Sequence, residues 1–341
     1  MVNYFNNPWK PLRHRILKDK RIEDALHEKG YFKGPSIEQD TVISIKALFD
    51  SLHTMDASDG GMFYSVYSRD LEYRNQVHEA LGTLLLPFLK DHFKDFKVMI
   101  NSYVAKVSGP KSEFYLHQDT TGMDEWKESP LNLWIPLDDV DESNGCLNVI
   151  PESHKWFSPY RSISFPAPFD NIQPVVKEYL KPIKMKGGEV LFFDNRILHN
   201  SGNNTSGKTR IAVVCGLFPK DADLITCHKS QYELEGEVEL IKHSDDFLLT
   251  YPKFLIDCQD RPHVGESLGF KEDPFQAIEE ETFRELCHKS GLQSNERTTV
   301  EQIDCQLIGE PDFIQSELKS EKEPATSPPS FLNRIKSFFN G

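Results

Sequence analysis

The spacing of apolar residues along the chain changes near residue 96, and this change separates two kinds of predicted structure. From about residue 22 to 94, apolar side chains recur every three or four positions, which is the period of an amphipathic helix. From about 97 to 220, short runs alternate between apolar and polar residues or are apolar throughout, as strands do. The pattern predicts helices first and a β-rich core after them.

The first helical stretch, residues 22–53, is predicted to be interrupted. Gly30 suits a helix C-cap, because glycine adopts the left-handed conformation without strain. Ser36, with Gln39 three residues later, has the spacing of a capping box that would begin a second helix. The sequence therefore predicts two helices within this stretch.

Two further helices are predicted from their apolar stripes and end signals. Residues 70–94 carry one stripe, and Pro87 within them is expected to kink or end the helix because it lacks a backbone N–H. Residues 273–289 are predicted as a late helix, with Asp273 as the N-cap and Pro274 at the first helical position.

The β-core is predicted as short strands joined by turns, with no helix between them. These strands are 97–107, 131–140, 143–151, 187–194 and 209–218. The pair Asn144-Gly145 is the strongest short signal for a tight hairpin. Strands in this arrangement favour an antiparallel sandwich or barrel.

The segments outside the core complete the expected domain organisation. The expected units are a basic N-terminal arm (1–24), a single domain (25–290) with its core at about 97–220, an acidic, Pro-rich linker of low order (291–330) and a short amphipathic segment (331–341). The last segment would place its aromatic and aliphatic side chains on one helix face. Packing back on the domain, docking on a carrier protein, another partner or a membrane surface, and disorder all stay open for it.

Charge excludes one class of function. The 341 residues carry a formal net charge of −14, whereas general nucleic-acid binding requires a basic face. The N-terminal arm is locally basic and is expected to be solvated and weakly ordered, with a docking role as the alternative. Its basic residues are Lys10, Arg13, Arg15, Lys18, Lys20 and Arg21.

Targeting signals and cysteine spacing favour a cytoplasmic protein. The first twenty residues lack the apolar run of a signal peptide. The most apolar stretch, residues 81–89, is far shorter than the roughly 20 residues that a spanning helix needs. The six cysteines are scattered and form no C-x-x-C pair, which favours free thiols in a reducing compartment.

The stretch "FYLHQDTTGMDEW" (114–126) holds candidate metal ligands. If strand geometry persists there, His117 and Asp119 point to the same face, because residues two apart on a strand do so. His199 follows a predicted buried strand and is a candidate third ligand. Two histidines and one carboxylate can hold Fe(II) on one side and leave the other side open. Alone, the first two residues are equally compatible with a solvated loop.

Arg210 indicates that the site binds an anion as well as a metal. It opens a mainly apolar strand, and a buried arginine needs an anion. Its planar guanidinium suits a carboxylate. The neighbours on the same face, Ala212, Val214 and Gly216, are small and leave room for a bound small acid.

The pattern "HQD…HNSGNNTSGKTR", with "LNLWIPLDDVDESNGCLNVIPESHK" between, resembles the phytanoyl-CoA dioxygenase family of Fe(II)- and 2-oxoglutarate-dependent oxygenases. The resemblance covers about residues 25–220 and is densest from 114 to 216. It implies a mainly β fold with flanking helices around a double-stranded β-helix, a cupin-like jelly roll. The chain departs from the family at Gly188-Glu189 and at Glu152, both in turns, so neither threatens the metal site.

The resemblance also implies roles for individual residues. His117, Asp119 and His199 would be the iron ligands and catalytic residues, and Arg210 with Ser201 would bind the distal carboxylate of 2-oxoglutarate. Trp134 matches a tryptophan that walls the co-substrate, and Met99 an apolar position on the first core strand. Asn132 is a candidate from its own position, since it shares the strand face of Trp134. Halogenating relatives replace the carboxylate with Ala or Gly, so Asp119 favours hydroxylation.

The expected function is therefore a dioxygenase that uses Fe(II), 2-oxoglutarate and O2 to hydroxylate a small organic substrate, free, coenzyme A-linked or carrier-bound, releasing succinate and CO2. Two alternatives stay open: a jelly-roll binding or structural protein with a non-catalytic site, and a metal-dependent hydrolase or isomerase on the same ligands. Segments 56–68 and 157–180 are predicted to form a substrate lid. His154 is expected to stabilise a turn, with substrate contact as the alternative.

Overall fold

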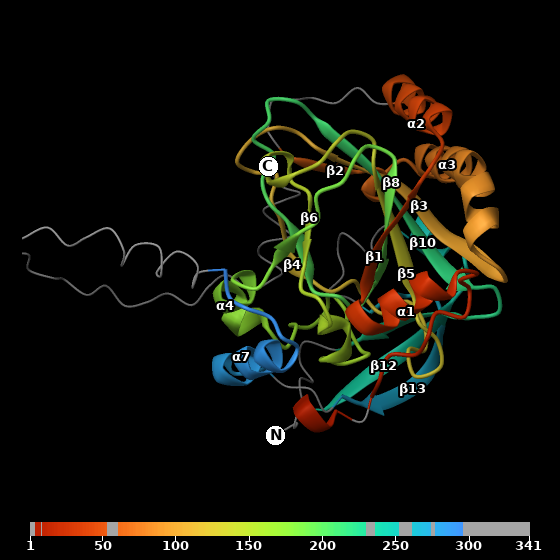
Figure 1. The fold of residues 1–341 in the computed structure, drawn as a ribbon. Coiled ribbons are helices and arrows are strands. Elements are labelled where there is room, and N and C mark those ends of the chain that lie inside the picture. Colours follow the sequence, from red (N-terminus) through yellow and green to blue (C-terminus); the bar gives the residue numbers. More distant parts are fainter. Residues whose placement is uncertain are drawn as a thin grey trace, which may run out of the picture.

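The structure is a computed structural model, and it describes residues 4–7, 9–52, 61–229, 236–251, 261–273 and 277–295. Two antiparallel sheets face each other and form the centre of the molecule (Figure 1). The larger sheet contains, in spatial order, β1 (Tyr31–Ser36), β8 (Glu189–Asp194), β5 (Leu131–Pro136), β10 (Arg210–Pro219), β3 (Phe96–Lys106) and β2 (Met62–Tyr64). The smaller sheet contains β4 (Phe114–His117), β9 (His199–Ser201), β6 (Leu147–Val149) and β7 (Lys181–Pro182).

From β3 to β10 the chain passes back and forth between the two sheets. Strands β3, β5, β8 and β10 belong to the larger sheet, and β4, β6, β7 and β9, which come between them in sequence, belong to the smaller one. This alternation is the winding of a double-stranded β-helix, so the predicted jelly-roll core is confirmed.

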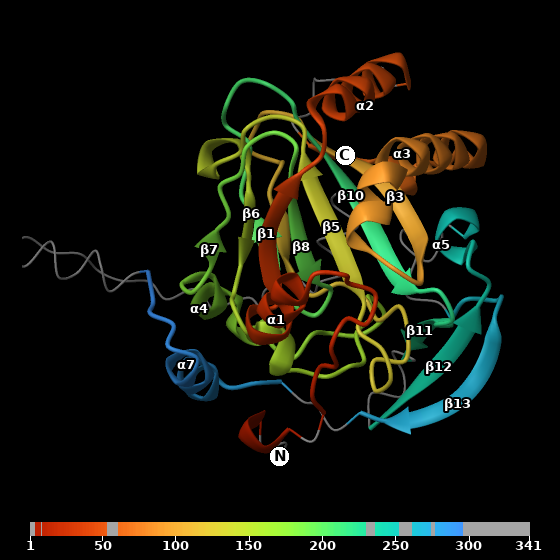
Figure 2. The same ribbon diagram turned by 45° about the vertical axis from the view of Figure 1, so that its right-hand side comes forward.

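A third antiparallel sheet lies at one end of the sandwich (Figure 2). It contains β11 (Leu224–His228), β12 (Glu237–His243) and β13 (Glu266–Glu272). The short helix α5 (Phe247–Thr250) follows β12. This sheet accounts for much of the region after residue 220, for which the sequence predicted only mixed structure.

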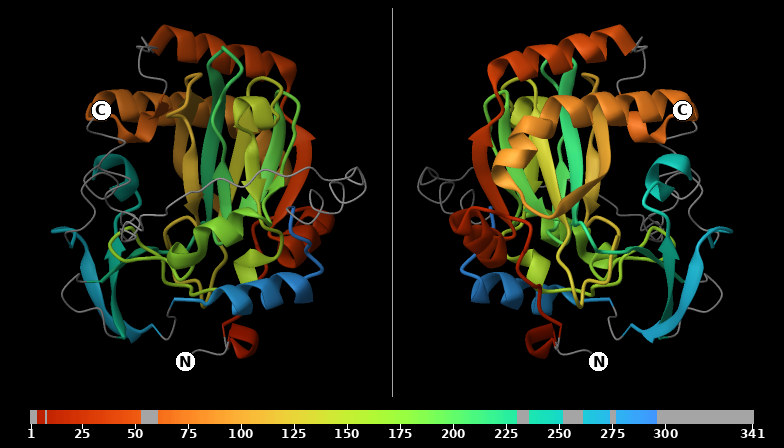
Figure 3. Two further views of the ribbon diagram at one scale, coloured as in Figure 1. Left: turned by 90° about the vertical axis from the view of Figure 1, so that its left-hand side faces the viewer. Right: turned by 90° about the vertical axis from the view of Figure 1, so that its right-hand side faces the viewer.

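Helices cover the outer face of the larger sheet and leave its inner face to the smaller sheet (Figure 3). Helices α2 (Gln39–Leu52) and α3 (Leu71–His92) bury Ile45 and Leu81 against outward-facing strand residues such as Tyr103 and Val213. Inward-facing residues, such as Val214 on β10 and Trp134 opposite it on β5, face the second sheet instead. Burial on both faces explains why these strands are rich in large apolar residues.

The helices before the core differ in part from the sequence prediction. Helix α1 (Lys20–Lys29) ends as predicted at Gly30, which has φ +80° and donates its N–H to the carbonyl of Leu26. The next segment is strand β1 instead of a helix start, because it pairs with β8 at the edge of the larger sheet. Ser36 is the last residue of that strand, so the predicted capping box with Gln39 does not form.

Helix α3 continues through Pro87, so the proline does not end it, because Leu85 and Leu89 hold the helix on the sheet on both sides of the proline. Two other local predictions were wrong. The late helix α7 (Glu280–Lys289) starts after Glu279, not at Asp273. Asn144 and Gly145 form a turn without a hairpin, since β5 before it and β6 after it belong to different sheets.

The basic N-terminal segment is packed, in contrast to the solvated arm that its charge predicted. Trp9 is 1% exposed, donates its indole N–H to the carbonyl of Glu125 and stacks under the guanidinium of Arg196. Ile16 is also buried in the core. Charge patterning missed this packing because the apolar residues are interleaved with basic ones that reach the surface.

The segments 296–330 and 331–341 lie outside the described residues, so the predicted linker and amphipathic segment stay predictions. No described helix has the length and hydropathy needed to cross a membrane.

Replacing Trp9 tests the packing of the N-terminal segment. We expect Trp9→Ala to lower the free energy of unfolding by about 3–5 kcal/mol, as the loss of a buried aromatic side chain does. Urea denaturation followed by circular dichroism measures this change. Leu12→Ala is the matched control, because Leu12 is 38% exposed and its replacement should cost less than about 0.5 kcal/mol. Equal, small effects of both changes would mean that the segment is not packed in solution.

Candidate functional site

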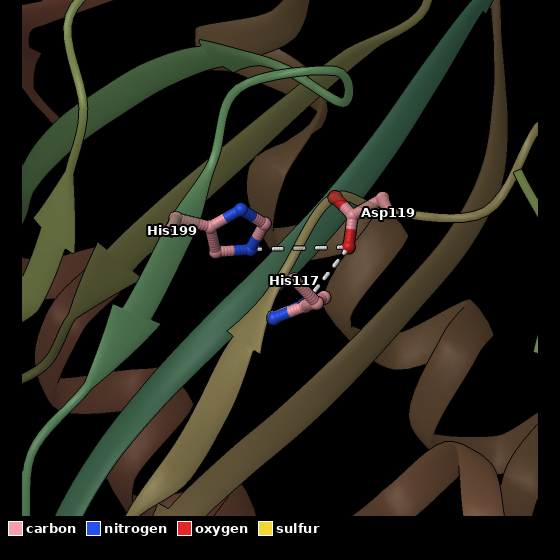
Figure 4. Close-up of side chains that lie close together, drawn as sticks. All are labelled: His117, Asp119 and His199. Atoms are coloured by element: carbon pink, nitrogen blue, oxygen red, sulfur yellow. Dashed lines mark ion pairs between the residues drawn. The ribbon is translucent and has the colours of Figure 1, made fainter. Parts of the chain in front are cut away.

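Three side chains meet inside the jelly roll, two from neighbouring strands and one from the loop after β4, which ends before Asp119. His117 ends β4 and lies opposite His199 of β9 in the antiparallel register, and Asp119 follows two residues after His117. One ligand atom from each of the three residues lies within 4.8 Å of the other two (Figure 4). The two histidines and the carboxylate that the sequence singled out are therefore brought together.

Backbone carbonyls hold the two imidazole rings in matching orientations. Nδ1 of His117 lies 2.9 Å from the carbonyl oxygen of Tyr115, and Nδ1 of His199 lies 2.9 Å from that of Ile197. Each Nδ1 donates its hydrogen there, so each Nε2 presents a lone pair to the shared centre. Such hydrogen bonds fix the ring and the tautomer of a metal-binding histidine.

The Asp119 carboxylate faces both rings and is held from behind. Its Oδ1 lies 3.5 Å from Nε2 of His117 and 3.9 Å from Nε2 of His199, while Oδ2 accepts a hydrogen bond of 2.8 Å from Asn132. The backbone of Asp119 is held as well, since its N–H donates to the carbonyl of Asn195 at 2.8 Å. One carboxylate oxygen is thus aimed at the centre and the other is occupied.

Arg161 fixes the other side of the Asp119 backbone. Its Nε donates to the carbonyl oxygen of Asp119 at 2.8 Å, and its two terminal nitrogens pair with the Glu125 carboxylate at 2.8 and 2.5 Å. Arg161 and Glu125 are both almost fully buried. A bidentate ion pair in a buried place is rigid, and it holds the loop after β4 in position.

Burial and neighbouring charges keep Asp119 and His199 in forms that bind metal. Burial raises the pKa of Asp119, but His199 and His117 outweigh this effect and leave that pKa below its usual value. Burial lowers the pKa of His199 to about 4, so this imidazole is neutral near pH 7. A charged carboxylate and imidazole lone pairs suit Fe(II), and their number leaves coordination positions open. The residues present fit such an ion.

Arg210 is a buried cation that has no anionic partner among the described residues. Its side chain is within the core, and its only hydrogen bond among the described residues is one of 3.3 Å to the carbonyl of Gly145. Its Nε and Nη1 have no hydrogen-bond partner in the part of the chain that the structure describes. Burial lowers the pKa of Arg210 to about 10, which still leaves it charged at neutral pH. The guanidinium lies over the ring of Trp134, 5.3 Å from its centroid.

One cavity of about 520 Å³ connects Arg210 with the two histidines and Asp119. Ser201, Trp134, Asn132 and Met99 all line it. Asn132 can reach Asp119 because Gly216 stands opposite it on β10, where a Cβ would lie only 3.2 Å from the asparagine oxygen. The co-substrate residues expected from the sequence therefore share one space.

A bulge changes which residues of β3 face the cavity. The pairing with β10 jumps from Ile100 opposite Gly216 to Val98 opposite Leu217, so Met99 has no partner. Strict alternation would place Met99 and Ile100 on opposite faces, but both line the cavity. Met99 packs beside Phe218.

The segments predicted as lids contribute to the cavity wall where they are described. Residues 62–64, 66–68 and 160–163 line it, together with 165–170, whereas 53–60 lie outside the described residues. His154 does not line it. This ring is buried, touches Gly30 and bonds to the carbonyl of His27 at 3.2 Å, as a turn-stabilising residue does.

Sequence reasoning missed Glu125, and it included Tyr64 and Arg161 only as members of the predicted lid segments. Tyr64 lines the cavity, and burial raises its pKa well above the usual value, while the charges of Arg210 and Asp119 act on it with opposite signs. No pattern in the sequence distinguishes this residue from the rest of its segment, because β2 is only three residues long. The pairing of Arg161 with Glu125 joins positions far apart in sequence and likewise leaves no local signal.

Comparison with known proteins identifies the family. The profile of the phytanoyl-CoA dioxygenase (PhyH) family matches residues 18–212. Phytanoyl-CoA dioxygenase 1 of Oryza sativa subsp. japonica is 32% identical over 198 residues, and phytanoyl-CoA dioxygenase of Arabidopsis thaliana is 26% identical over 199. Each match covers 57% of this chain and 64% of the relative, so the chain spans a little under two thirds of the length of these curated relatives.

A solved structure resembles the chain more distantly. The non-heme alpha ketoglutarate dependent carbocyclase SnoK from nogalamycin biosynthesis is 19% identical, with a TM-score of 0.45, over 63% of this chain and 90% of that one. A likeness at this level carries no argument about activity. Because the family profile matches more than half of its residues, the chain belongs to the phytanoyl-CoA dioxygenase family.

Proposed function

We propose that this chain is an Fe(II)- and 2-oxoglutarate-dependent dioxygenase that hydroxylates a small organic substrate, with succinate and CO2 as co-products. The observation that carries the proposal is the unpaired, buried guanidinium of Arg210 in the cavity that also contains the three ligand atoms. A buried cation of this kind is costly unless an anion joins it. A dicarboxylic acid can reach the metal with one end and Arg210 with the other.

Each site residue then has a specific task. His117, Asp119 and His199 hold Fe(II), which when bound with 2-oxoglutarate and O2 supplies the oxidising power for C–H hydroxylation. Arg210 pairs with the distal carboxylate, with Ser201 beside it, and Trp134 forms the wall under the guanidinium. Asn132 keeps one oxygen of Asp119 away from the ion, so that the carboxylate binds through the other. Met99 forms part of the apolar wall.

The alternatives are disfavoured by specific features. A binding or structural protein has no use for three convergent ligand atoms whose rings are held by backbone carbonyls. A hydrolase or isomerase on the same ligands would leave Arg210 without a partner. Anaerobic addition of Fe(II) and then 2-oxoglutarate separates the three proposals, because only the oxygenase should give a visible charge-transfer band and then form succinate in air.

The state of the cysteines supports a proposal about the cellular compartment. The cysteines at 146, 215, 227 and 287 are free and buried. We propose a reducing compartment such as the cytoplasm, where such thiols persist.

Removing the guanidinium tests the assignment of Arg210. We expect Arg210→Ala to weaken 2-oxoglutarate binding about 100-fold, because a charged, buried hydrogen-bond donor is lost, and to change Fe(II) affinity less than about twofold. Anaerobic calorimetry measures both constants. Arg284→Ala is the control, since Arg284 pairs with Glu178 instead of lining the cavity. If Arg210→Ala loses the metal and keeps 2-oxoglutarate, the roles are assigned wrongly.

Tyr64 is expected to donate its hydroxyl to the same carboxylate. Its raised pKa keeps the phenol neutral and able to donate, and it is close enough to Arg210 for the two to affect each other's pKa. We expect Tyr64→Phe to weaken 2-oxoglutarate binding about tenfold in the same assay, with Fe(II) affinity unchanged. Tyr67→Phe, on the neighbouring ring, is the control. An unchanged 2-oxoglutarate affinity in Tyr64→Phe would exclude this contact.

A further inference from the structure

The cavity continues beyond the three ligand residues, away from Arg210. Arg210, Val214, Gly216 and Phe218 line it in this order along β10. Asn132, which holds Asp119, stands opposite Gly216, so the metal ligands lie at that level of the strand. Phe218 comes after this level, so the part of the cavity around it lies on the other side of the metal ligands from Arg210.

We call this part the distal chamber and define it by its apolar wall. Its lining residues are Met99, Gly122, Phe218, Leu224 and Leu248. Met99, Phe218 and Leu224 belong to one buried apolar cluster, and Leu248 packs against it. Gly122 is required for this wall, because a Cβ at that position would lie 2.6 Å from the ring of Phe218.

The charged side chains that line the cavity already have partners in the protein or are assigned to the metal and the co-substrate. Apart from the metal-binding residues and Arg210, they are Arg161 and Asp170 within the described lining. Arg161 is paired with Glu125 and the carbonyl of Asp119, and Asp170 accepts hydrogen bonds from Ala167 and Gln173. An ionised group that entered the distal chamber would therefore lose its hydration without gaining a counter-ion there.

The polar groups that remain available are neutral. The side-chain oxygens of Gln118 and Asn195 are buried, line the cavity and have no hydrogen-bond partner among the described residues. Both can accept a hydrogen bond from a hydroxyl or an amide. Lys229 lies outside the lining, over the ring of Phe165 at 5.6 Å from its centroid.

We propose that the distal chamber takes a compact, uncharged and predominantly apolar molecule that enters whole, and that ionised substrates, including coenzyme A thioesters, are not its ligands. This inference rests on the proposed function, because the chamber is a substrate site only if the neighbouring residues hold the iron. The whole cavity, which includes the space beside Arg210 as well as the distal chamber, has a volume of about 520 Å³, within the range of pockets that bind small molecules.

Four probe molecules test the proposal: three share the adamantane cage and differ in charge, and the fourth is coenzyme A. We would titrate the full-length protein, with and without 2-oxoglutarate, with 1-adamantanol, adamantane-1-carboxylate, 1-adamantanamine and coenzyme A, and measure dissociation constants by calorimetry. We expect 1-adamantanol to bind at least about tenfold more tightly than either charged cage, and coenzyme A not to bind. Compact cages are used because a longer molecule could keep its charge outside, near Lys229.

Two variants locate the binding. Leu248 is half-buried, so Leu248→Lys should fold, weaken 1-adamantanol about tenfold and strengthen adamantane-1-carboxylate about tenfold. Phe270→Ala is the control for adsorption to exposed aromatic surface, since Phe270 is 60% exposed on β13 and does not line the cavity. It should leave all four dissociation constants unchanged.

Each outcome decides between the two proposals. Tighter binding of the carboxylate or of coenzyme A than of 1-adamantanol in the unmodified protein would overturn the inference, as would the absence of saturable 1-adamantanol binding. The Fe(II) and 2-oxoglutarate titration of the same sample reports on the oxygenase separately. An intact titration with failed probes removes the substrate class alone. The reverse result removes the oxygenase, and with it the role of the chamber as a substrate site, and leaves only an apolar binding site.

Discussion

The pairing of β4 with β9 is the constraint on which the site depends. It places His117 opposite His199, and the two rings then lie 4.1 Å apart between centroids. A slip of one residue would send one ring to the other face of the sheet and destroy the ligand set. β9 is only three residues long, so its register is fixed from both sides, by β4 and by β6. The jelly-roll winding makes this possible, because it returns distant segments to the same small sheet.

The two charged groups nearest this strand pairing, Asp119 and Arg210, differ in how many partners the fold gives them. Asp119 is surrounded by partners: two imidazoles, the amide of Asn132 and, through its backbone, the buried pair of Arg161 and Glu125. Among the described residues, Arg210 has only one carbonyl and an aromatic ring as partners. The carboxylate is thus held in place before any ligand arrives, while under the proposed function the guanidinium would gain its main partner on binding. Preorganisation at the metal end and a strong requirement for an anion at the other end fit a site that orders its co-substrate.

The parts of the fold that the sequence predicted are those with a local signal. Alternation in 97–107 and 209–218 predicted two central strands, and the spacing of His117, Asp119, His199 and Arg210 predicted residues that the fold does bring into one cavity. Their roles stay predictions. Where tertiary contacts decide, the sequence was insufficient: β1 is a strand because β8 offers an edge, and Trp9 is buried because Arg196 and Glu125 provide its contacts. The bulge at Met99 and the position of Tyr64 in the cavity wall depend on neighbouring strands and have no signature in single-chain patterns.

The apolar wall of the distal chamber would select its ligand by shape more than by hydrogen bonds. Burial of apolar surface is not directional, so an apolar wall binds many frameworks without orienting them by hydrogen bonds. Orientation toward the metal ligands must then come from shape, and the main shaping contact is the ring of Phe218 against Gly122. The amides of Gln118 and Asn195 can add one polar contact close to Asp119. Under the proposed function, the outline of the wall would decide which C–H bond faces the iron. Small changes at Gly122 or Phe218 should then redirect the reaction more than they weaken binding.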